Sequence, residues 1–404
     1  MIQTAVFGFG TVGGGVVDLI ENNQKQIRRA LPQGLHVKYI LDIREFPDSP
    51  YKDRVVHDID TILSDPEIKI VCETMGGKEP ARTFTMKALE RGISVCTSNK
   101  ELVAAFGPEL LAAARAHDCS YLFEASVGGG IPLIHPLLNC LAQEEISSVI
   151  GIMNGTTNYI LTKMDTEGAD YQTVLKEAQA LGYAERNPEA DVEGHDTGRK
   201  LSILSSLVTG KTVRYEDIYV EGISSITIDD LRYAKANGYA VRLLGISRRT
   251  DEGLSVMTAP FLLPVGHPLA SVSGVFNGIM IHGNMVDDVM FYGRGAGKEP
   301  TGSAVVADMI HAAGSIGRTI PITWETQEEK LQDFLTHKTR FMIRVAAAAE
   351  AAVRQSFKGK ISDSWKLEDL PEECALITQS ITEAEYQECA AKAGTILGRI
   401  RILD

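Results

Sequence analysis

The N-terminal segment places the strongest constraint on the fold of this chain. Residues 2–7, I-Q-T-A-V-F, are typical of a buried strand, and they run directly into G-F-G-T-V-G and an expected helix. Such a turn brings backbone N–H groups and the helix dipole to one point, where they can hold a pyrophosphate. We therefore predict a dinucleotide-binding Rossmann domain, although a glycine turn without a ligand remains the alternative. The predicted cofactor-binding residues of the turn are Gly8, Phe9, Gly10, Thr11, Val12 and Gly13.

The end of the next expected strand bears on the choice between NAD and NADP. Residues 36–41 form that strand, and Asp42 closes it. An acid at this place binds the ribose hydroxyls of NAD, whereas a nearby arginine accommodates the 2′-phosphate of NADP. Because Arg44 follows Asp42, both cofactors stay open, with a lean toward NAD from the strand-end acid.

Two further strand ends are expected at the same edge of the parallel sheet. Residues 68–73 are followed by T-M-G-G, and residues 93–97 are followed by S-N-K. Open α/β sheets bind ligands beyond the carboxyl ends of their strands, so Thr74 is a cofactor-binding candidate. Lys100 is expected at a helix start, where a positive charge is unfavourable beside the helix dipole. The pattern leaves two interpretations of Lys100 open, a surface residue and a functional one.

A glycine-rich segment after the next strand predicts irregular backbone. Residues 120–124 form the strand, and A-S-V-G-G-G-I-P follows at 125–132. The exposed carbonyl groups of this segment, together with Glu124, could ligate a hard cation. From the residues alone, a simple crossover between domains is the favoured interpretation.

The pattern changes from residue 146 onward, which predicts a second domain. A strand at 149–153 runs into N-G-T-T-N-Y-I-L, where we expect a helix capped by Thr156 or Thr157. A later glycine turn includes Gly295 and has two interpretations. Its backbone approaches the cofactor or the substrate, or the turn is a plain hairpin. Further strands with helices against them indicate a mixed sheet, and they are expected at 239–247, 254–262, 278–283 and 289–292.

The densest group of charges lies between Gly182 and Lys200, in a loop and the start of a helix. The apolar stripe of that helix, stepped backward by four residues, passes through Lys200 and Asp196. Both charges therefore have the phase of the buried face, where a charge requires a partner or a ligand. An i,i+4 ion pair on a solvated face is one interpretation. With Glu185 and Asp191 in the preceding loop, a cluster that holds an amino-acid-like substrate is the other.

The C-terminal segment predicts an additional small domain. After a polar linker, its expected elements follow the order strand, helix, two strands, helix and strand, which is the β-α-β-β-α-β ferredoxin-like pattern. The predicted fold class is therefore α/β with three domains. These are a Rossmann domain at 1–145, a mixed α+β catalytic and dimerisation domain at 146–322, a linker at 323–337 and the ferredoxin-like domain at 338–404.

Composition excludes several functional classes. The 404 residues carry a net charge of −13, which argues against a nucleic-acid partner or an anionic membrane surface. No apolar run reaches transmembrane length, and residues 2–9 are too short and lack the basic leader of a signal peptide. The six cysteines are scattered without a C-x-x-C pair. Neither a disulfide framework nor a zinc site is expected, and the expected location is the cytoplasm.

Several motifs, taken together and in this order, resemble the homoserine dehydrogenase family. The C-terminal segment resembles the ACT regulatory domain of many members. The motifs are G-F-G-T-V-G at 8–13, T-S-N-K at 97–100, E-A-S-V-G-G-G-I-P at 124–132, G-I-M-N-G-T-T-N-Y-I-L at 151–161, G-Y-A-E and D-V-E-G-H-D-T-G-R-K within 182–200, H-P-L-A at 267–270 and G-R-G-A-G at 293–297.

The resemblance implies reversible, NAD(P)H-dependent reduction of L-aspartate 4-semialdehyde to L-homoserine, in the pathway to threonine and methionine. Lys100 matches the catalytic lysine of the family, and Ser98 in the same motif is a cofactor-binding position. Lys200 matches a second lysine, which would polarise the carbonyl oxygen or relay the proton. The carboxylates that correspond to the family's substrate-binding positions are Glu185, Asp191 and Asp196.

The resemblance also implies a bound monovalent cation and an oligomer. In the family, a cation such as sodium is held as a structural aid, and the matching positions are Glu124 with the carbonyl groups of Val127, Gly129 and Ile131. A homodimer through the sheet of the second domain is implied, or a homotetramer if the ACT-like domains pair.

Departures from the family pattern leave some expectations open. Asn187 and Arg294 replace an aspartate and a proline found in many members, but neither removes a group that the chemistry requires. The segment that receives an amino-acid effector is replaced by residues 346–353 without glycine or proline, so threonine binding is in doubt. Two alternatives are a dehydrogenase of another small amino acid and a catalytically idle amino-acid sensor. The idle reading requires loss of a chemical group, yet both lysines and all three carboxylates are present.

Overall fold

The computed structural model of the protein describes residues 1–403. The chain forms two compact units. The first unit consists of Met1–Glu144, Ser202–Tyr215 and Gly293–Glu329, and the second contains the other described residues. Across residues 1–403, no helix has both the length and the apolar character that a bilayer crossing requires.

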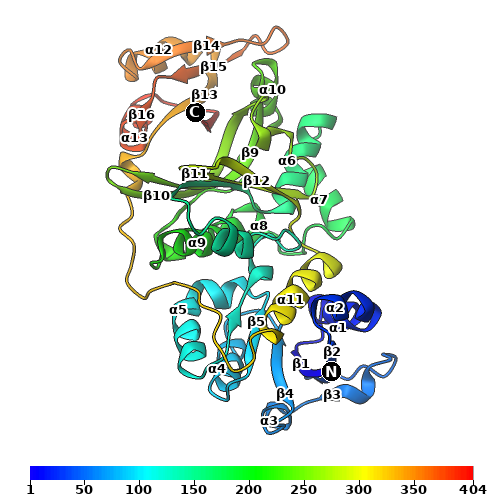
Figure 1. The fold of residues 1–404 in the computed structure, drawn as a ribbon. Helices are drawn as coiled ribbons and strands as arrows, with labels where there is room; N and C mark the ends of the chain where they lie inside the picture. The colour runs from blue at the N-terminus through cyan, green and yellow to red at the C-terminus, as the bar shows by residue number, and fades with distance from the viewer. Residues whose placement is uncertain (404) are drawn as a thin grey trace. The chain divides into compact units, whose positions relative to one another are not determined.

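The first unit contains the predicted Rossmann sheet. Six parallel strands are ordered β3-β2-β1-β4-β5-β6, which is the doubly wound dinucleotide-binding order (Figure 1). The last four residues of the central strand β1 are buried, as expected for a strand covered on both faces. The strands are β1 (Ile2–Phe7), β2 (Leu35–Leu41), β3 (Val55–Val56), β4 (Ile68–Glu73), β5 (Ser94–Thr97) and β6 (Tyr121–Leu122).

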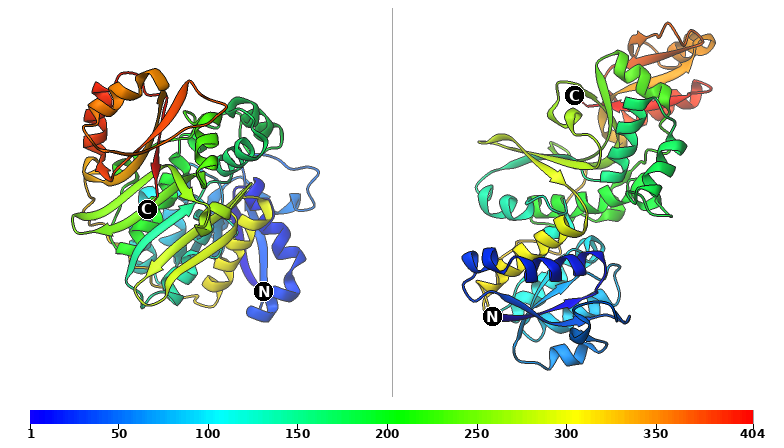
Figure 2. Two further views of the ribbon diagram at one scale, coloured as in Figure 1. Left: turned by 90° about the horizontal axis from the view of Figure 1, so that it is seen from above. Right: turned by 90° about the vertical axis from the view of Figure 1, so that its right-hand side faces the viewer.

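A helix from late in the sequence completes this unit. Helix α11 packs beside α1 and against β4 and β5, as the yellow and dark blue helices show in Figure 2. The approach is close because Gly302 faces Gly15, where a Cβ atom would meet backbone at 2.9 Å. The helices are α1 (Thr11–Asn22), α2 (Gln24–Ala30), α3 (Ile59–Leu63), α4 (Ala81–Leu89), α5 (Lys100–Ala116) and α11 (Lys298–Ala313).

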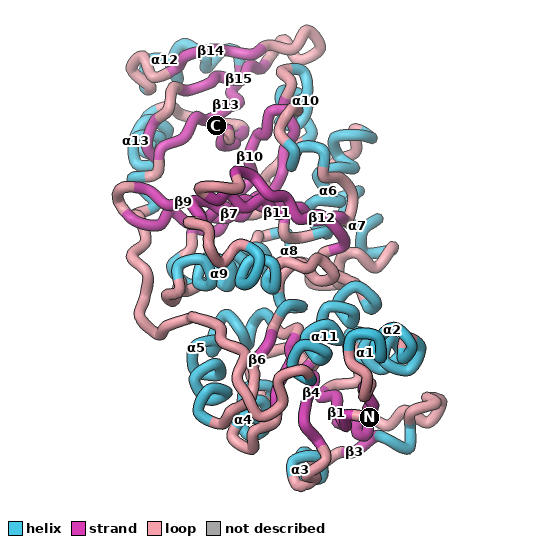
Figure 3. The backbone as a smooth tube through the Cα atoms, viewed as in Figure 1, coloured by secondary structure: helices cyan, strands magenta, loops and turns pink. Residues whose placement is uncertain are grey.

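The second unit is built on the predicted mixed sheet, here with eleven strands (magenta in Figure 3). The order is β12-β11-β7-β9-β10-β17-β13-β15-β14, and β16 and β8 pair with β13 and β10. The strands are β7 (Ile146–Ile152), β8 (Tyr219–Val220), β9 (Tyr239–Thr250), β10 (Gly253–Pro264), β11 (Phe276–Gly283), β12 (Asp287–Arg294), β13 (Lys338–Ala346), β14 (Ile361–Trp365), β15 (Glu373–Thr378), β16 (Ile381–Thr382) and β17 (Gly398–Ile402).

Helices cover this sheet and carry the charged stretch of the sequence. The helix predicted to start between Gly182 and Lys200 is α9, which begins at His195 and places Asp196 and Lys200 in its first two turns. The other helices are α6 (Gly155–Glu167), α7 (Tyr171–Ala180), α8 (Glu189–Val192), α10 (Ile228–Ala236), α12 (Glu350–Ser356) and α13 (Glu383–Lys392), and α9 itself spans His195–Thr209.

The C-terminal strands adopt the predicted ferredoxin-like topology. The order β17-β13-β15-β14 is antiparallel throughout, with α12 and α13 as the two helices. One face packs Phe341 and Phe357 against these helices, and the other face adds Met342 to the core around α6 and α10. Because β17 pairs with β10, this segment shares its sheet with the rest of the second unit. The boundaries at 145, 322 and 337 stay predictions.

Two buried ion-pair clusters also join the C-terminal strands to the elements before them. Arg401 of β17, with no exposed surface, binds Glu383 at 2.5 Å and Glu221 at 2.6 Å. Arg344 of β13 binds Asp230 of α10 at 3.0 Å. Because a buried charge that loses its partner costs several kcal/mol, about 3–5, these pairs fix the C-terminal segment in place.

Candidate functional site

The glycine turn in the first unit has the geometry that a dinucleotide requires. Gly8 has a φ of +91°, and a Cβ atom at Gly13 would overlap the carbonyl oxygen of Gly8. The space around Gly10 is open, with no atom within 4 Å of a Cβ placed there. Gly10 is also the N-cap of α1, and no side chain caps this helix and no acid lies in its first turn. The helix N-terminus is therefore able to bind a phosphate.

Asp42 lies at the end of β2 beside this turn, and its carboxylate is fully engaged. Its Oδ2 accepts from the backbone N–H of Phe9 at 2.8 Å and from Nη2 of Arg44 at 2.9 Å. Its Oδ1 accepts from the backbone N–H and from Nε of Arg44, both at 3.0 Å. The hydrogen bonds from Arg44 hold the pKa of Asp42 at about 2, below its usual value. Four donors occupy the carboxylate, while the Arg44 side chain stays 58% exposed.

The other predicted positions of the first unit follow β4 and β5. The Thr74 hydroxyl donates to the carbonyl oxygens of Phe7 and Gly8 at 3.1 and 2.9 Å, so this side chain supports the glycine turn. The backbone N–H of Ser98 donates to the carbonyl oxygen of Glu73 at 3.3 Å. Lys100 is the first residue of α5, as expected, and both Ser98 and Lys100 are partly exposed.

The glycine-rich segment after β6 is irregular, as predicted. The Glu124 carboxylate accepts from the backbone N–H groups of Leu133, Ile134 and His135 at 2.5 to 2.9 Å. Burial raises the pKa of Glu124, and these hydrogen bonds oppose the shift. Three donors thus occupy this carboxylate, and a cation at Glu124, Val127, Gly129 and Ile131 stays a prediction.

This segment also lies against the second glycine turn. A Cβ atom at Gly129 would overlap the carbonyl oxygen of Gly295, and the N–H of Gly130 donates to the carbonyl oxygen of Arg294 at 3.1 Å. Only glycine at position 129 permits this approach. Gly295, a predicted cofactor position, lies in the turn between β12 and α11 and is buried.

The second unit brings Asp191, Asp196 and Lys200 together. Lys200 is 8% exposed, and its Nζ donates to Oδ2 of Asp196 and to the carbonyl oxygen of Met153, both at 2.7 Å. Asn154 links the two acids, because its Nδ2 lies 2.7 Å from Asp191 Oδ1 and 2.8 Å from Asp196 Oδ2. The i,i+4 pair is thus present but buried, so the interpretation as a pair on a solvated face is wrong.

Asn154 is the residue of this cluster that the sequence analysis missed. Its Oδ1 accepts from the N–H of Thr157, so Asn154 caps α6 and the predicted Thr156 or Thr157 cap is wrong. Thr156 instead donates to the Tyr183 carbonyl oxygen at 2.6 Å and contacts Asp191 at 3.2 Å. The usual preference for asparagine before a helix, in the run N-G-T-T, is a signal that could have identified the cap.

The remaining carboxylates differ in their surroundings. Burial, and then the charge of Asp196, raise the pKa of Asp191. Asp191 is half-buried and stands nearest to solvent in the cluster. Glu185 is exposed in the preceding loop, and its backbone carbonyl, not its carboxylate, accepts from Gln179 at 3.1 Å. Its predicted role stays a prediction.

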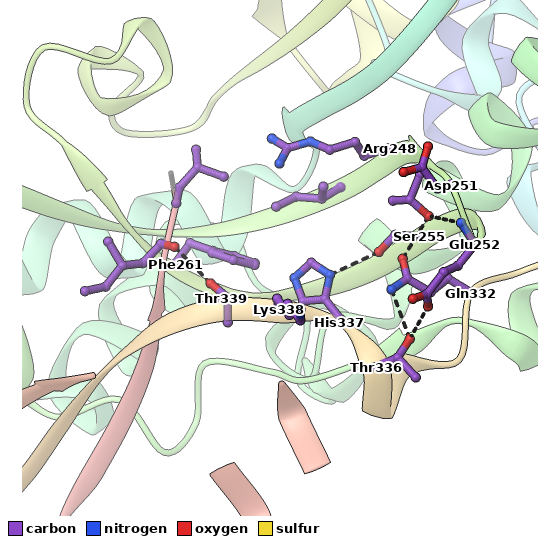
Figure 4. A pocket seen from close by; sticks show the side chains of 14 residues that line it. Arg248, Asp251, Glu252, Ser255, Phe261, Gln332, Thr336, His337, Lys338 and Thr339 are labelled. Atoms are coloured by element: carbon purple, nitrogen blue, oxygen red, sulfur yellow. Dashed lines mark hydrogen bonds between the residues drawn. The ribbon is translucent and has the colours of Figure 1, made fainter. Parts of the chain in front are cut away.

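A separate cavity of about 310 Å³ in the second unit contains none of the predicted site residues. His337 points into it toward Ser255, at 3.2 Å, and Thr336 donates to Glu252 at 2.8 Å (Figure 4). Burial, and then the charges of Arg401 and Arg248, lower the pKa of His337 to about 4. The imidazole is therefore neutral near pH 7.

The first unit defines the class of protein. A parallel sheet in the dinucleotide-binding order ends in a glycine turn that leaves a helix N-terminus open, and such a domain serves a nicotinamide cofactor in dehydrogenases. The protein is therefore an NAD(P)-dependent oxidoreductase.

The particular family follows from comparison with known proteins. The homoserine dehydrogenase family model matches residues 132–310, and the model of the homoserine dehydrogenase NAD-binding domain matches residues 8–124. The chain belongs to the homoserine dehydrogenase family.

Similar proteins agree with this assignment. The chain is 43% identical over 324 residues to a homoserine dehydrogenase of Synechocystis sp., a match covering 78% of this chain and 74% of that protein. The crystal structure of a homoserine dehydrogenase from Thiobacillus denitrificans matches with a TM-score of 0.91 and 34% identity, over 100% of this chain and 98% of that one. A hyperthermophilic archaeal homoserine dehydrogenase in complex with NADPH is 27% identical, with a TM-score of 0.67, over 80% of this chain and 99% of that one.

Proposed function

We propose that this chain interconverts L-homoserine and L-aspartate 4-semialdehyde with NAD(P) as the hydride carrier. The buried Lys200, held between Asp196 and the Met153 carbonyl oxygen, is the observation that carries the proposal in a member of this family. An amino-acid substrate presents an ammonium group and a reacting oxygen, and it therefore needs carboxylates and a proton donor. The cluster supplies both kinds of group.

The carboxylates divide into two roles in this proposal. Asp191 is half-buried and is the acid that receives the substrate ammonium group, which also offsets the cost of burying its charge. Asp196 is 4% exposed and orients Lys200, whose ammonium group polarises the reacting oxygen. Glu185 is the third proposed carboxylate, and its exposed side chain is available to a ligand.

Lys100 is proposed as the catalytic lysine of the first unit. It opens α5 directly after β5, at the strand end where the Rossmann fold holds its ligands. The bound cofactor supplies or accepts the hydride, and a lysine here stabilises the charge of the reacting oxygen or relays its proton.

The variant Lys100→Ala tests this role. Turnover of L-homoserine should fall by about 10² or more, while NADPH affinity, measured by fluorescence titration, should stay nearly unchanged. Near-normal turnover would remove Lys100 from the proposed mechanism.

We propose NADP as the preferred cofactor, although Asp42 at the end of the second strand slightly favoured NAD when the sequence was considered alone. Arg44 already occupies the Asp42 carboxylate, which has no acceptor position left for ribose hydroxyls. The exposed Arg44 guanidinium suits a 2′-phosphate, which it can bind with charge-assisted hydrogen bonds.

The C-terminal segment is proposed as an ACT-like regulatory domain whose effector site is altered. The ferredoxin-like strand order supports the assignment as an ACT-like domain. The connection from β13 to α12 supports the loss of the effector site. Residues 347–349 of this connection form a short turn of three alanines. Such a turn lacks the glycine that would bring backbone N–H groups close to a bound carboxylate.

Three further expectations from the family are retained as proposals. A monovalent cation is proposed on Glu124 and the carbonyl oxygens of Val127, Gly129 and Ile131. The oligomer is proposed to be a homodimer through the sheet of the second unit, or a homotetramer if the ACT-like segments pair. The location is proposed to be the cytoplasm, in keeping with the free cysteines among the described residues.

A further inference from the structure

We propose that Glu73 is a positioning residue, whose buried carboxylate ties the loop carrying Thr74 to the loop carrying Lys100. The proposal rests on the role of Lys100 given above. Glu73 is the last residue of β4, and none of its surface is exposed. It therefore touches neither solvent nor a bound ligand, and any effect on the reaction passes through the residues that it holds.

The hydrogen bonds of Glu73 reach both loops. Its Oε1 accepts from the backbone N–H of Met75 at 2.8 Å, which fixes the first loop. Its Oε2 accepts from the Thr97 hydroxyl at 2.6 Å, at the end of the neighbouring strand β5. The Thr97 oxygen in turn accepts from the N–H of Asn99 at 2.9 Å. The Thr97 hydroxyl therefore accepts one hydrogen bond, from Asn99, and donates its single proton to Glu73.

Asn99 carries this connection to Lys100. Its Oδ1 accepts from the N–H of Leu102 at 3.1 Å and so caps α5, of which Lys100 is the first residue. Its Nδ2 donates to the carbonyl oxygen of Gly77 at 2.7 Å, which closes the connection back to the first loop. Two hydrogen bonds therefore separate the Glu73 carboxylate from the cap that sets the start of α5.

Only a carboxylate satisfies both donors at this place. Met75 and Thr97 each require an acceptor, and a glutamine amide offers one acceptor oxygen and one donor nitrogen. Burial raises the pKa of Glu73, and the hydrogen bonds from Thr97 and Met75 oppose this shift. Burying a carboxylate has an unfavourable desolvation free energy, and a hydrophobic side chain at the same place would avoid it. We attribute the presence of Glu73 to its hydrogen bonds to the loops that carry Thr74 and Lys100.

The test compares turnover of L-homoserine by wild type, Glu73→Gln, Thr97→Val and Thr97→Ser. We expect Thr97→Val and Glu73→Gln each to lower kcat by about tenfold or more, because each breaks the same connection. Thr97→Ser keeps the hydroxyl and should stay within about threefold of wild type. The double variant Glu73→Gln/Thr97→Val should fall little below the worse single variant, since linked residues act non-additively.

Thr85→Val in α4 is the matched control. Thr85 is as buried as Thr97, but its hydroxyl has no hydrogen-bond partner within residues 1–403, so its kcat should stay within about twofold of wild type. Three outcomes would overturn the positioning role of Glu73 and leave the proposed function standing. They are an undiminished kcat in Thr97→Val, an equal loss of kcat in Thr85→Val, and additive losses of kcat in the double variant. Absence of wild-type turnover would overturn the proposed function and this role with it.

Discussion

Replacing Lys200 by methionine separates the structural part of its ion pair from the functional part. The change removes an ammonium group that donates to Asp196 and to the Met153 carbonyl oxygen, both at 2.7 Å. Asp196, whose side chain is 6% exposed, would keep the hydrogen bond from Asn154 but lose the ammonium group of Lys200. Breaking one side of a buried pair costs about 3–5 kcal/mol, and we expect a loss near 4 kcal/mol because the Met153 carbonyl oxygen also loses its donor.

The double variant Asp196→Asn/Lys200→Met should recover part of this stability. Replacing the Asp196 carboxylate removes the cost of a buried charge that has lost Lys200, and we expect about 1–3 kcal/mol to return. Turnover of L-homoserine should stay at least about 10²-fold below wild type in both variants, because neither has the ammonium group.

The chain offers a matched control and a local probe for this experiment. Glu388 and Lys392 form an i,i+4 pair in the same acid-first order, but their side chains are 68% and 54% exposed. Lys392→Met should therefore change the free energy of unfolding far less than Lys200→Met does. Trp365 packs against the core of the second unit, so its fluorescence in a Trp324→Phe background follows urea unfolding of the unit that contains Lys200. Restored turnover in the double variant, or equal costs for Lys200→Met and Lys392→Met, would refute the reasoning.

Three further predictions concern the cofactor site and regulation. Arg44→Ala should raise KM for NADP about tenfold and leave KM for NAD nearly unchanged, and equal changes in both constants would contradict the assignment of Arg44 to the 2′-phosphate. Because the pKa of Asp42 is lowered from 3.8 to about 2, its stabilisation is present above about pH 4 and is lost as the pH falls toward 2. The free energy of unfolding, measured with urea, should accordingly be larger for wild type than for Asp42→Asn at pH 5, and this difference should shrink by pH 3. A difference that stays constant between pH 5 and pH 3 would argue against the lowered pKa of Asp42. Threonine at about 1 mM should change turnover less than twofold, since the β13–α12 connection has no glycine or proline, and clear inhibition in steady-state assays would oppose this view.

Local patterns were sufficient to predict the main features of the fold. The strand-like sequence of β1 and the glycine turn after it predicted a Rossmann domain, because both depend on residues adjacent in the chain. The stripe of α9 likewise predicted that Asp196 and Lys200 lie on a buried face. Strand and helix order in residues 338–402 was predicted for the same reason, except for the two-residue strand β16.

Contacts between distant segments could not be predicted from local patterns. Asn154 lies 37 and 42 residues before Asp191 and Asp196, and only the folded chain brings its amide between the two acids. The pairing of β17 with β10 likewise joins segments that no sequence period connects. Arg44 shows a third kind of limit, because its bond to Asp42 is local but depends on side-chain geometry that a motif does not specify.

The central claim is tested most directly by mixing the purified protein with L-homoserine and either NADP or NAD at mildly alkaline pH. Absorbance of the reduced cofactor at about 340 nm should rise with homoserine, with a lower KM for NADP than for NAD. No increase with either cofactor would contradict the account.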